Sequence, residues 1–214
     1  MATAKDRQSL AVWEEFHKSL LRGVEVDNSL TRQDIERQRA QLERDPIEWI
    51  KFFFPAYAKY EFAPFHIRAI RRVIANDEWY EVLSWSRELA KSTVAMFILM
   101  FLTLTRRKRF VALASATIDS AKRLLLPFKI NFESNPRIRQ FYGEQTTIGQ
   151  WTDSEFSCRC GAKFIALGAG SAPRGMRNEA IRPDILYFDD YDTDEDCRNP
   201  VTLDKKWDWA EHAL

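Results

Sequence analysis

The sequence predicts an α/β fold with a mainly parallel central sheet and a helical appendage on its N-terminal side. From residue 80 onward, short apolar segments alternate with segments of helical periodicity, which is typical of strands joined by helices. Apolar residues make up 45% of the 214, enough to build a substantial core. A Lys-Ser pair also stands between an expected strand and an expected helix, where a phosphate-binding loop would lie.

The chain divides into two expected regions, residues 1–45 and residues 46–214. In 1–45 basic and acidic residues nearly balance, and partial helical stripes indicate a helical appendage with solvated faces. A docking helix for a partner is the alternative. The second region opens with two helices: Asp45 is placed to cap the first, Pro46 stands at its first position, and Pro64 opens the next in the same way.

The remaining elements follow from apolar runs and helix signals. Strands are expected at Tyr80–Trp85, Phe110–Ser115 and Ile185–Phe188, and a hairpin is expected over residues 151–168 with its turn near Arg159–Gly161. Helices are expected at Lys91–Leu104, where the helix is buried, from Thr117 to about Phe132 with a kink at Pro127, and from about Thr202 to the end.

Charge and composition exclude several classes of protein. The 32 basic residues face 31 acidic ones, so a globally basic nucleic-acid coat is excluded while a local basic channel stays open. Three cysteines do not make a disulfide framework. The longest apolar run, Val94–Leu102, falls short of the roughly 20 residues that a membrane span needs, and no basic-then-apolar leader opens the chain. We therefore expect a soluble intracellular protein.

The segment Ser84–Thr93 carries the strongest functional signal. A loop at a helix N-terminus offers backbone N–H groups and the positive end of the helix dipole to an anion. Lys91 is then placed to reach the β- and γ-phosphates and Ser92 to ligate Mg²⁺, as in a Walker A motif. Trp85 and Ala90 stand where that motif has glycine, so the alternative is a helix N-terminus with an incidental Lys-Ser-Thr.

A second signal lies about a hundred residues later. The apolar strand Ile185–Phe188 delivers Asp189 and Asp190 to its carboxyl end, where open α/β sheets bind their ligands. One carboxylate would hold Mg²⁺ through water, and the next would orient or deprotonate the attacking water. A solvated acidic loop is the alternative, because seven of the thirteen residues in 184–196 are acidic. Together the two segments predict an ATP site on a three-layer core of the P-loop NTPase type.

In these motifs residues 46–214 resemble the ATPase domain of the large terminase subunit of tailed bacteriophages, the motor that packages DNA. The loop Ser86–Thr93 is similar to that family's deviant Walker A, which keeps an early arginine. Three other segments carry the resemblance: Ala112–Thr117 followed by Ser120-Ala121 is similar to the strand–turn–helix after the first crossover, Arg174-Gly175 resembles the Arg-Gly turn, and Ile185–Asp190 resembles the Walker B strand.

The resemblance implies roles for individual residues. The nucleotide-binding loop would consist of Ser86, Arg87, Glu88, Leu89, Ala90, Lys91, Ser92 and Thr93. Arg87 would act on the γ-phosphate within the subunit. Ser92 and Asp189 would hold Mg²⁺, and Asp190, standing where the family usually has Glu, would be the catalytic carboxylate.

Two further positions gain a role from the resemblance, each with an alternative. Arg174 would be an arginine finger acting across a subunit boundary, with Arg177 as the second choice; a loop arginine bound to solvent or to DNA phosphate is the alternative. His66, in the segment Phe62–His66, stands where the family recognises adenine, often with Gln. A histidine at an ordinary helix start is the alternative.

The resemblance implies Mg²⁺-dependent ATP hydrolysis that drives double-stranded DNA into a procapsid. The partners would be DNA, the small terminase subunit and the portal protein, in a homo-oligomeric ring when assembled and as a monomer when alone, in the host cytoplasm and without a membrane. Only 24 residues follow Asp190. We therefore expect an N-terminal piece of a longer protein, with an incomplete ATPase domain, no nuclease domain and weak turnover. The alternatives are a helicase-like DNA translocase and a non-catalytic scaffold with a degenerate phosphate loop.

Weaker signals stay open. Cys158-Arg159-Cys160 at the expected hairpin tip offers fewer than the four ligands that zinc takes. The basic run Arg106–Arg109 is either a solvated turn or a contact to the DNA backbone. The same two interpretations apply to Arg68, Arg71 and Arg72 on one expected helix.

Overall fold

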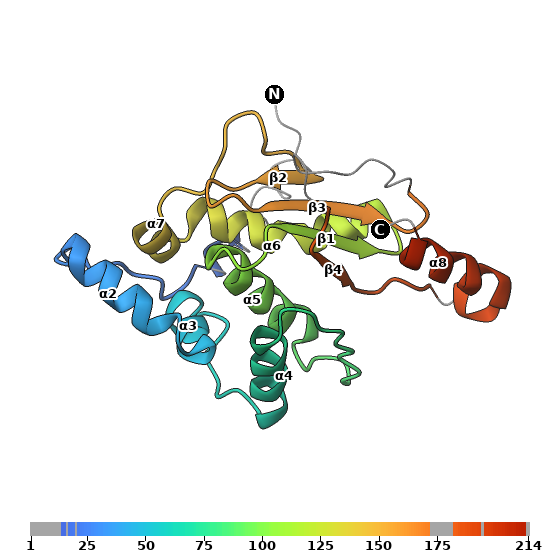
Figure 1. Cartoon of the computed structure of the whole chain (residues 1–214), viewed down its shortest axis with the longest axis horizontal. Coiled ribbons are helices and arrows are strands. Elements are labelled where there is room, and N and C mark those ends of the chain that lie inside the picture. Colours follow the sequence, from blue (N-terminus) through green and yellow to red (C-terminus); the bar gives the residue numbers. More distant parts are fainter. Residues whose placement is uncertain (1–13, 16, 20, 172–181, 194, 213–214) are drawn as a thin grey trace. The chain divides into compact units, whose positions relative to one another are not determined.

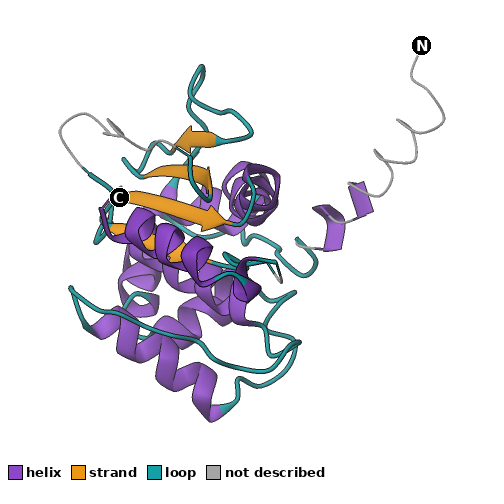
Figure 2. Cartoon of the chain, turned by 90° about the vertical axis from the view of Figure 1, so that its right-hand side faces the viewer, coloured by secondary structure: helices purple, strands orange, loops and turns teal. Residues whose placement is uncertain are grey.

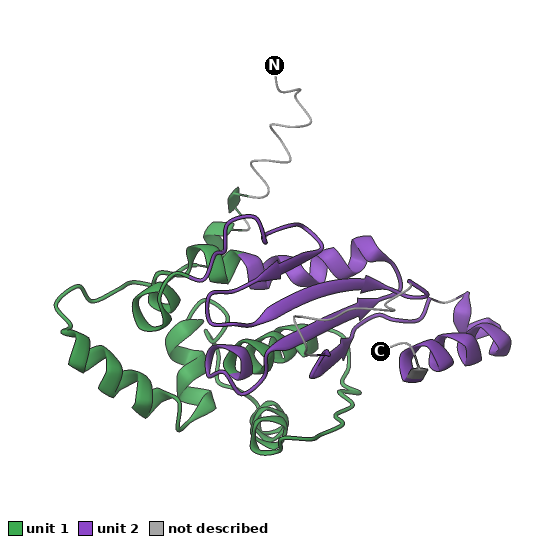
Figure 3. Cartoon of the chain, turned by 45° about the horizontal axis from the view of Figure 1, so that its top comes forward, with its two compact units in different colours: residues 1–101, 130–144 green, residues 102–129, 145–214 purple. Residues whose placement is uncertain are grey.

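The computed structural model describes residues 14–15, 17–19, 21–171, 182–193 and 195–212, and it divides the chain into two compact units (Figure 3). Unit 1 holds residues 1–101 and 130–144, and unit 2 holds residues 102–129 and 145–214. Helices α5 (Lys91–Leu104) and α6 (Ile118–Ser134) contribute residues to both units. The other elements each belong to one unit.

Unit 1 is helical in its described residues (Figure 1). Besides parts of α5 and α6 it contains α2 (Arg32–Leu42), α3 (Pro46–Phe53), α4 (Pro64–Ala75) and α7 (Pro136–Tyr142). The Asp45 carboxylate accepts a hydrogen bond from the Ile47 N–H, which confirms the predicted cap on α3. The two proline-led helices and the bounds of α5 are also confirmed. Helix α7, capped by Asn135, was not predicted.

Aromatic side chains form the core of unit 1. Trp49, Phe53 and Phe54 of the α3 region are fully buried, and so are Phe97 and Phe101 of α5. The ring centroids of Trp49 and Phe101 lie 5.2 Å apart, as do those of Phe54 and Phe97. This cluster fixes α3 against the first three turns of α5, because edge-to-face and tilted aromatic pairs at such distances pack favourably.

Unit 2 contains one mixed, mostly parallel sheet (Figure 2). Its strands are β1 (Phe110–Ser115), β2 (Glu155–Ser157), β3 (Lys163–Gly168) and β4 (Ile185–Phe188), in the order β2-β3-β1-β4. Strand β1 pairs in parallel with both β3 and β4, and β2 pairs antiparallel with β3. The predictions of strands β1 and β4, of the hairpin and of a mainly parallel sheet are therefore confirmed.

A carboxylate fixes the start of β4 beside the start of β1. Asp184 accepts hydrogen bonds from the N–H groups of Arg109 and Phe110, each at 2.8 Å. The last residue of β3, Gly168, lies against the turn into α6, where an added Cβ would lie 2.7 Å from the backbone nitrogen of Ile118. Only glycine fits this close approach, because a real Cβ never comes that near a backbone atom.

Different helices cover the two faces of this sheet. Phe128 of α6 lies 5.4 Å, centroid to centroid, from Phe164 of β3. Residues on the other face, which alternates with the first along each strand, contact α8 (Pro200–His212) through Trp209. Unit 2 is therefore an α/β unit whose layers are compatible with a three-layer core. The last helix begins at Pro200, two residues before the predicted Thr202.

The strand predicted at Tyr80–Trp85 is wrong. These residues form no strand, and none of the sheet's four strands comes from unit 1. Tyr80 and Val82 are exposed, at 78% and 66%. Glu81 instead accepts hydrogen bonds from the Arg72 guanidinium and the Trp79 indole, so side-chain contacts rather than a ladder hold the segment.

Two further predictions bear on the helices. Helix α6 begins after Thr117, whose hydroxyl accepts from the Ser120 N–H, and it continues through Pro127 to Ser134; a kink at Pro127 stays a prediction. No helix in the described part of the chain is long and apolar enough to cross a membrane.

Candidate functional site

The loop before α5 has a left-handed backbone at two residues that are not glycine. Glu88 has φ 66° and Ala90 has φ 54°. Such a conformation costs an L-residue about 1–2 kcal/mol. Ala90 occupies the position at which a Walker A motif has glycine, and it adopts the backbone that glycine would supply there without strain. Ala90 therefore has a glycine-like φ although the glycine is missing.

The side chain of Lys91 folds back over this loop. Its Nζ donates a hydrogen bond to the Trp85 carbonyl at 2.9 Å, and the Ala90 carbonyl accepts the first helical bond of α5 from the Val94 N–H. The first turn of α5 contains no acidic residue that would offset the positive end of its dipole. A cation, a helix N-terminus and an exposed turn thus lie together, which is the arrangement that favours an anion.

The other predicted loop residues lie at the surface. Ser86, Arg87, Glu88 and Ser92 are exposed, Leu89 is 38% exposed, and Thr93 is half-buried. The hydroxyl of Ser92 and the guanidinium of Arg87 therefore belong to an accessible loop, as the predicted contacts to phosphate and metal require.

His66 connects the start of α4 to the loop. Its Nδ1 accepts a hydrogen bond from the Ala63 N–H at 3.3 Å, so its Nε2 carries the proton and donates to the Leu89 carbonyl at 3.1 Å. Both ring nitrogens are engaged with backbone, and an adenine edge would have to displace one of these bonds. The rings of Phe65 and Trp85 flank the imidazole, with centroids 4.2 and 5.1 Å from it. The two hydrogen bonds of His66 are called the latch below. No sequence pattern indicates the bond to Leu89, since the two residues lie 23 positions apart.

The two carboxylates at the end of β4 are held differently. The Asp189 N–H bonds to the Ala114 carbonyl of β1, and the Asp189 carboxylate accepts from the Tyr187 hydroxyl at 2.9 Å. Asp190 has φ 44°, and its carbonyl accepts from the Ala116 N–H at 3.1 Å. Asp and Asn tolerate a left-handed backbone better than longer side chains do, which is a local reason for Asp rather than Glu at this position.

The chain that follows these carboxylates is anchored to α8. Lys206 donates to the Tyr191 carbonyl at 2.9 Å and forms an ion pair with Asp196. The hydrogen bond from Lys206, together with one from the Thr193 hydroxyl, lowers the pKa of Asp196 to about 2. The anchor limits how far the strand end can move.

Both segments carry side chains of kinds that suit a hard cation. A serine hydroxyl and aspartate oxygens are ligands that Mg²⁺ accepts, with phosphate oxygens and water completing its shell. Ser92 belongs to unit 1 and both carboxylates to unit 2, so each half stands on its own geometry. Within the described residues, His, Cys, Asp and Glu side chains form no cluster of three or more that could hold a metal alone. Arg174 and Arg177 lie outside the described residues.

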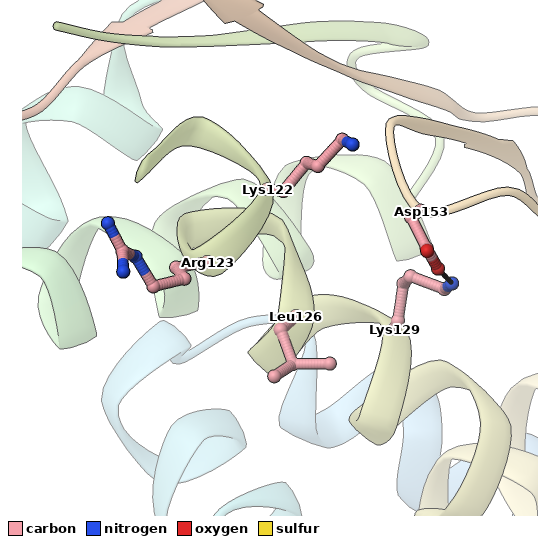
Figure 4. Close-up of a pocket in the computed structure, with 5 residues that line it drawn as sticks. All are labelled: Lys122, Arg123, Leu126, Lys129 and Asp153. Atoms are coloured by element: carbon pink, nitrogen blue, oxygen red, sulfur yellow. Dashed lines mark ion pairs between the residues drawn. The ribbon is translucent and has the colours of Figure 1, made fainter. Parts of the chain in front are cut away.

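Two of the three arginines predicted as a possible DNA contact on one helix are close to carboxylates. On α4, Arg72 is paired with Glu81, and Arg71 lies 3.7 Å from Asp45, which reduces their availability to DNA. A hollow of about 220 Å³ on unit 2 was not predicted (Figure 4). Its lining consists of Lys122, Arg123, Leu126, Lys129 and Asp153.

Comparisons with known proteins add no family. No protein-family model matches this chain, and no curated protein matches it. The terminase resemblance therefore depends on the sequence motifs alone.

Proposed function

We propose that this chain is an ATPase motor domain of the terminase large-subunit type, which hydrolyses ATP with Mg²⁺ to move double-stranded DNA. The observation that carries the proposal is the loop: Ala90 holds the glycine-like backbone at the place where the motif needs it, and Lys91 closes over the turn. An ordinary helix start gains nothing from backbone strain of this kind. Strained backbone concentrates at ligand clamps and active sites.

Each residue then has a proposed task. Lys91 exchanges the Trp85 carbonyl for phosphate oxygens, and Arg87 holds the γ-phosphate. Asp190 orients the attacking water and accepts its proton. Ser92 and Asp189 are the residues that would hold Mg²⁺, which when bound neutralises charge on the β- and γ-oxygens. Arg174, or Arg177, is the proposed finger in a ring of copies, with the portal and the small subunit as further proposed partners.

The decisive test is equilibrium binding of Mg·ATP by calorimetry to the whole chain, with Lys91→Ala as the test variant. Lys205→Ala is the matched control, since Lys205 is an exposed lysine of α8. We expect saturable binding by the wild type and by the control, and its loss in Lys91→Ala. Unchanged binding by Lys91→Ala would reject the loop as the phosphate site.

A second candidate function has one observation in its favour. The segment before the loop, Tyr80–Trp85, adds no strand to the sheet of the described residues. A non-catalytic scaffold with a degenerate phosphate loop would tolerate that. A scaffold of this kind would bind no Mg·ATP, even when circular dichroism showed that the chain was folded. A helicase-like translocase would bind ATP and would also separate DNA strands.

DNA binding is testable on unit 2. The hollow beside α6 is lined by three basic side chains and one carboxylate. Lys129, which is 13% exposed, donates a hydrogen bond to the Thr152 carbonyl at 3.0 Å and lies 3.6 Å from the Asp153 carboxylate. Removing one phosphate contact with Lys122→Ala should weaken duplex binding for all sequences alike. It should also lower the slope of log K against log salt by about 1. An unchanged slope would exclude this hollow as a DNA contact.

A further inference from the structure

The tip of the β2–β3 hairpin is a closely tied turn that carries two cysteines. The Cys158 N–H donates to the Ala162 carbonyl at 2.7 Å, and the Gly161 N–H donates to the Cys158 carbonyl at 2.9 Å. Gly161 has φ 94°, the left-handed backbone that such a turn requires and glycine adopts freely. The side chain of Gln145, 1% exposed, accepts from the Cys160 N–H at 3.2 Å. The turn is therefore held from both sides.

The two thiols inside this turn differ in environment. Cys158 is 4% exposed, while Cys160 is half-buried and reaches solvent. The Cys158 thiol donates a hydrogen bond to the Cys160 sulfur, the Ala162 N–H donates to the same sulfur, and the Arg106 guanidinium adds positive charge. These groups favour a thiolate on Cys160 and outweigh the opposing effect of its burial.

The acidities follow from these contacts. The hydrogen bond from Cys158, the Ala162 N–H and Arg106 lower the pKa of Cys160 to about 7. Burial, and then the bond given to Cys160, raise the pKa of Cys158 well above its ordinary range. At neutral pH Cys160 is therefore about half thiolate beside the protonated thiol of Cys158, which is the composition of a reactive cysteine site.

We propose that Cys158 and Cys160 form a modification site for small-molecule disulfides, with Cys160 as the attacking group and Cys158 as the resolving group. The proposal is independent of the ATPase assignment, since neither cysteine belongs to the loop or to the strand end.

The chemistry takes two balanced steps. In the first, the Cys160 thiolate attacks a disulfide RSSR, a Cys160–S–S–R bond forms, and RS⁻ leaves with the electron pair of the broken bond. In the second, the Cys158 sulfur attacks the Cys160 sulfur, and the second R group leaves as a thiol that carries the Cys158 proton. Overall the two cysteines are oxidised to one disulfide, and RSSR is reduced to RS⁻ and RSH.

The test uses the chromogenic aromatic disulfide DTNB on the full chain with Cys197→Ser, which removes the exposed third thiol. We expect release of two thionitrobenzoate anions per chain and a final mass lower by two hydrogen atoms. Adding Cys158→Ala should leave a stable mixed disulfide and release only one anion. A Cys197→Ser product that still has Cys158 and keeps the adduct would overturn the resolving role of Cys158.

The pH profile tests the attacking role separately. The rate at Cys160 should show its midpoint near pH 7, against about 8.5 for an ordinary thiol. Arg106→Gln should raise that midpoint without changing the number of reactive thiols. A midpoint for Cys160 equal to that of Cys197, measured in a Cys158→Ala, Cys160→Ser chain, would overturn the proposal. Circular dichroism of each variant confirms that the comparison is made between folded chains.

Discussion

The loop before α5, called the loop half below, and the end of β4 with Asp189 and Asp190, called the carboxylate half, obtain their geometry by different means. The loop places Glu88 and Ala90 in left-handed backbone and is latched from outside by His66. The carboxylate half follows from strand pairing, since the Asp189 N–H continues the β1–β4 ladder to the Ala114 carbonyl. Only its last residue, Asp190, is left-handed, and Asp is among the residues that accept this conformation most readily.

This difference teaches where local sequence rules are broken. Left-handed backbone favours glycine, and in the hairpin turn Gly161 is the residue that adopts it. The loop before α5 breaks the rule with an alanine and a glutamate. Departures of this kind are expected at functional sites, where neighbouring structure compensates the strain. The predictions that follow probe the two halves in turn.

The largest effect is expected at the carboxylate half. Asp190→Asn keeps the shape of the side chain and a residue type that tolerates φ 44°. Folding and Mg·ATP binding should stay unchanged, while single-turnover hydrolysis falls by about 10²–10⁴-fold because the general base is lost. Turnover that persists in Asp190→Asn would transfer the base role to Asp189 or to another acid.

The latch of the loop half comes next. His66→Ala removes two backbone hydrogen bonds and should lower the free energy of unfolding by about 1 kcal/mol, as loss of a helix cap does. His66→Gln should recover part of it, since a glutamine at this helix position can reach back to the Ala63 N–H. The ratio of the affinities for ATP and GTP separates the two roles of His66. If His66 only holds the loop, His66→Ala leaves this ratio unchanged. If His66 recognises adenine, His66→Ala changes it.

Reciprocal exchanges test the contrast between the two turns. Ala90→Gly should raise the free energy of unfolding by about 0.5–1 kcal/mol, because relieved strain outweighs the added freedom of the unfolded chain. Gly161→Ala should lower it by a similar amount, and nothing lies within 4 Å of the added Cβ, so only the backbone contributes. Urea denaturation measures both. If both substitutions change the free energy of unfolding in the same direction, the proposed difference between the two turns is contradicted.

Several elements were predictable because their signals are local. The helix Lys91–Leu104 and the strands at Phe110–Ser115 and Ile185–Phe188 lie where composition and flanking residues place them. The prediction of a strand at Tyr80–Trp85 was wrong because a strand needs a neighbouring strand to pair with. The residues of the segment itself do not show whether such a neighbour is present. The latch of His66 was missed for the same reason, since it depends on a carbonyl contributed by another element. For the candidate site, the motifs predicted Lys91 and Asp190, and only the structure revealed the left-handed backbone at Ala90.

The smallest expected effect concerns the anchor behind the carboxylate half. Because the folded-state pKa of Asp196 is lowered to about 2 from an ordinary 3.8, its stabilising contribution is present above pH 3.8 and is lost as the pH falls toward 2. Asp196→Asn removes the ion pair between Lys206 and Asp196 at every pH. The difference in melting temperature between wild type and Asp196→Asn should therefore be constant at neutral pH and shrink between pH 4 and 2, while the titration of all other carboxylates cancels. If the difference in melting temperature stays constant down to pH 2, the charge of Asp196 does not contribute to anchoring the strand end.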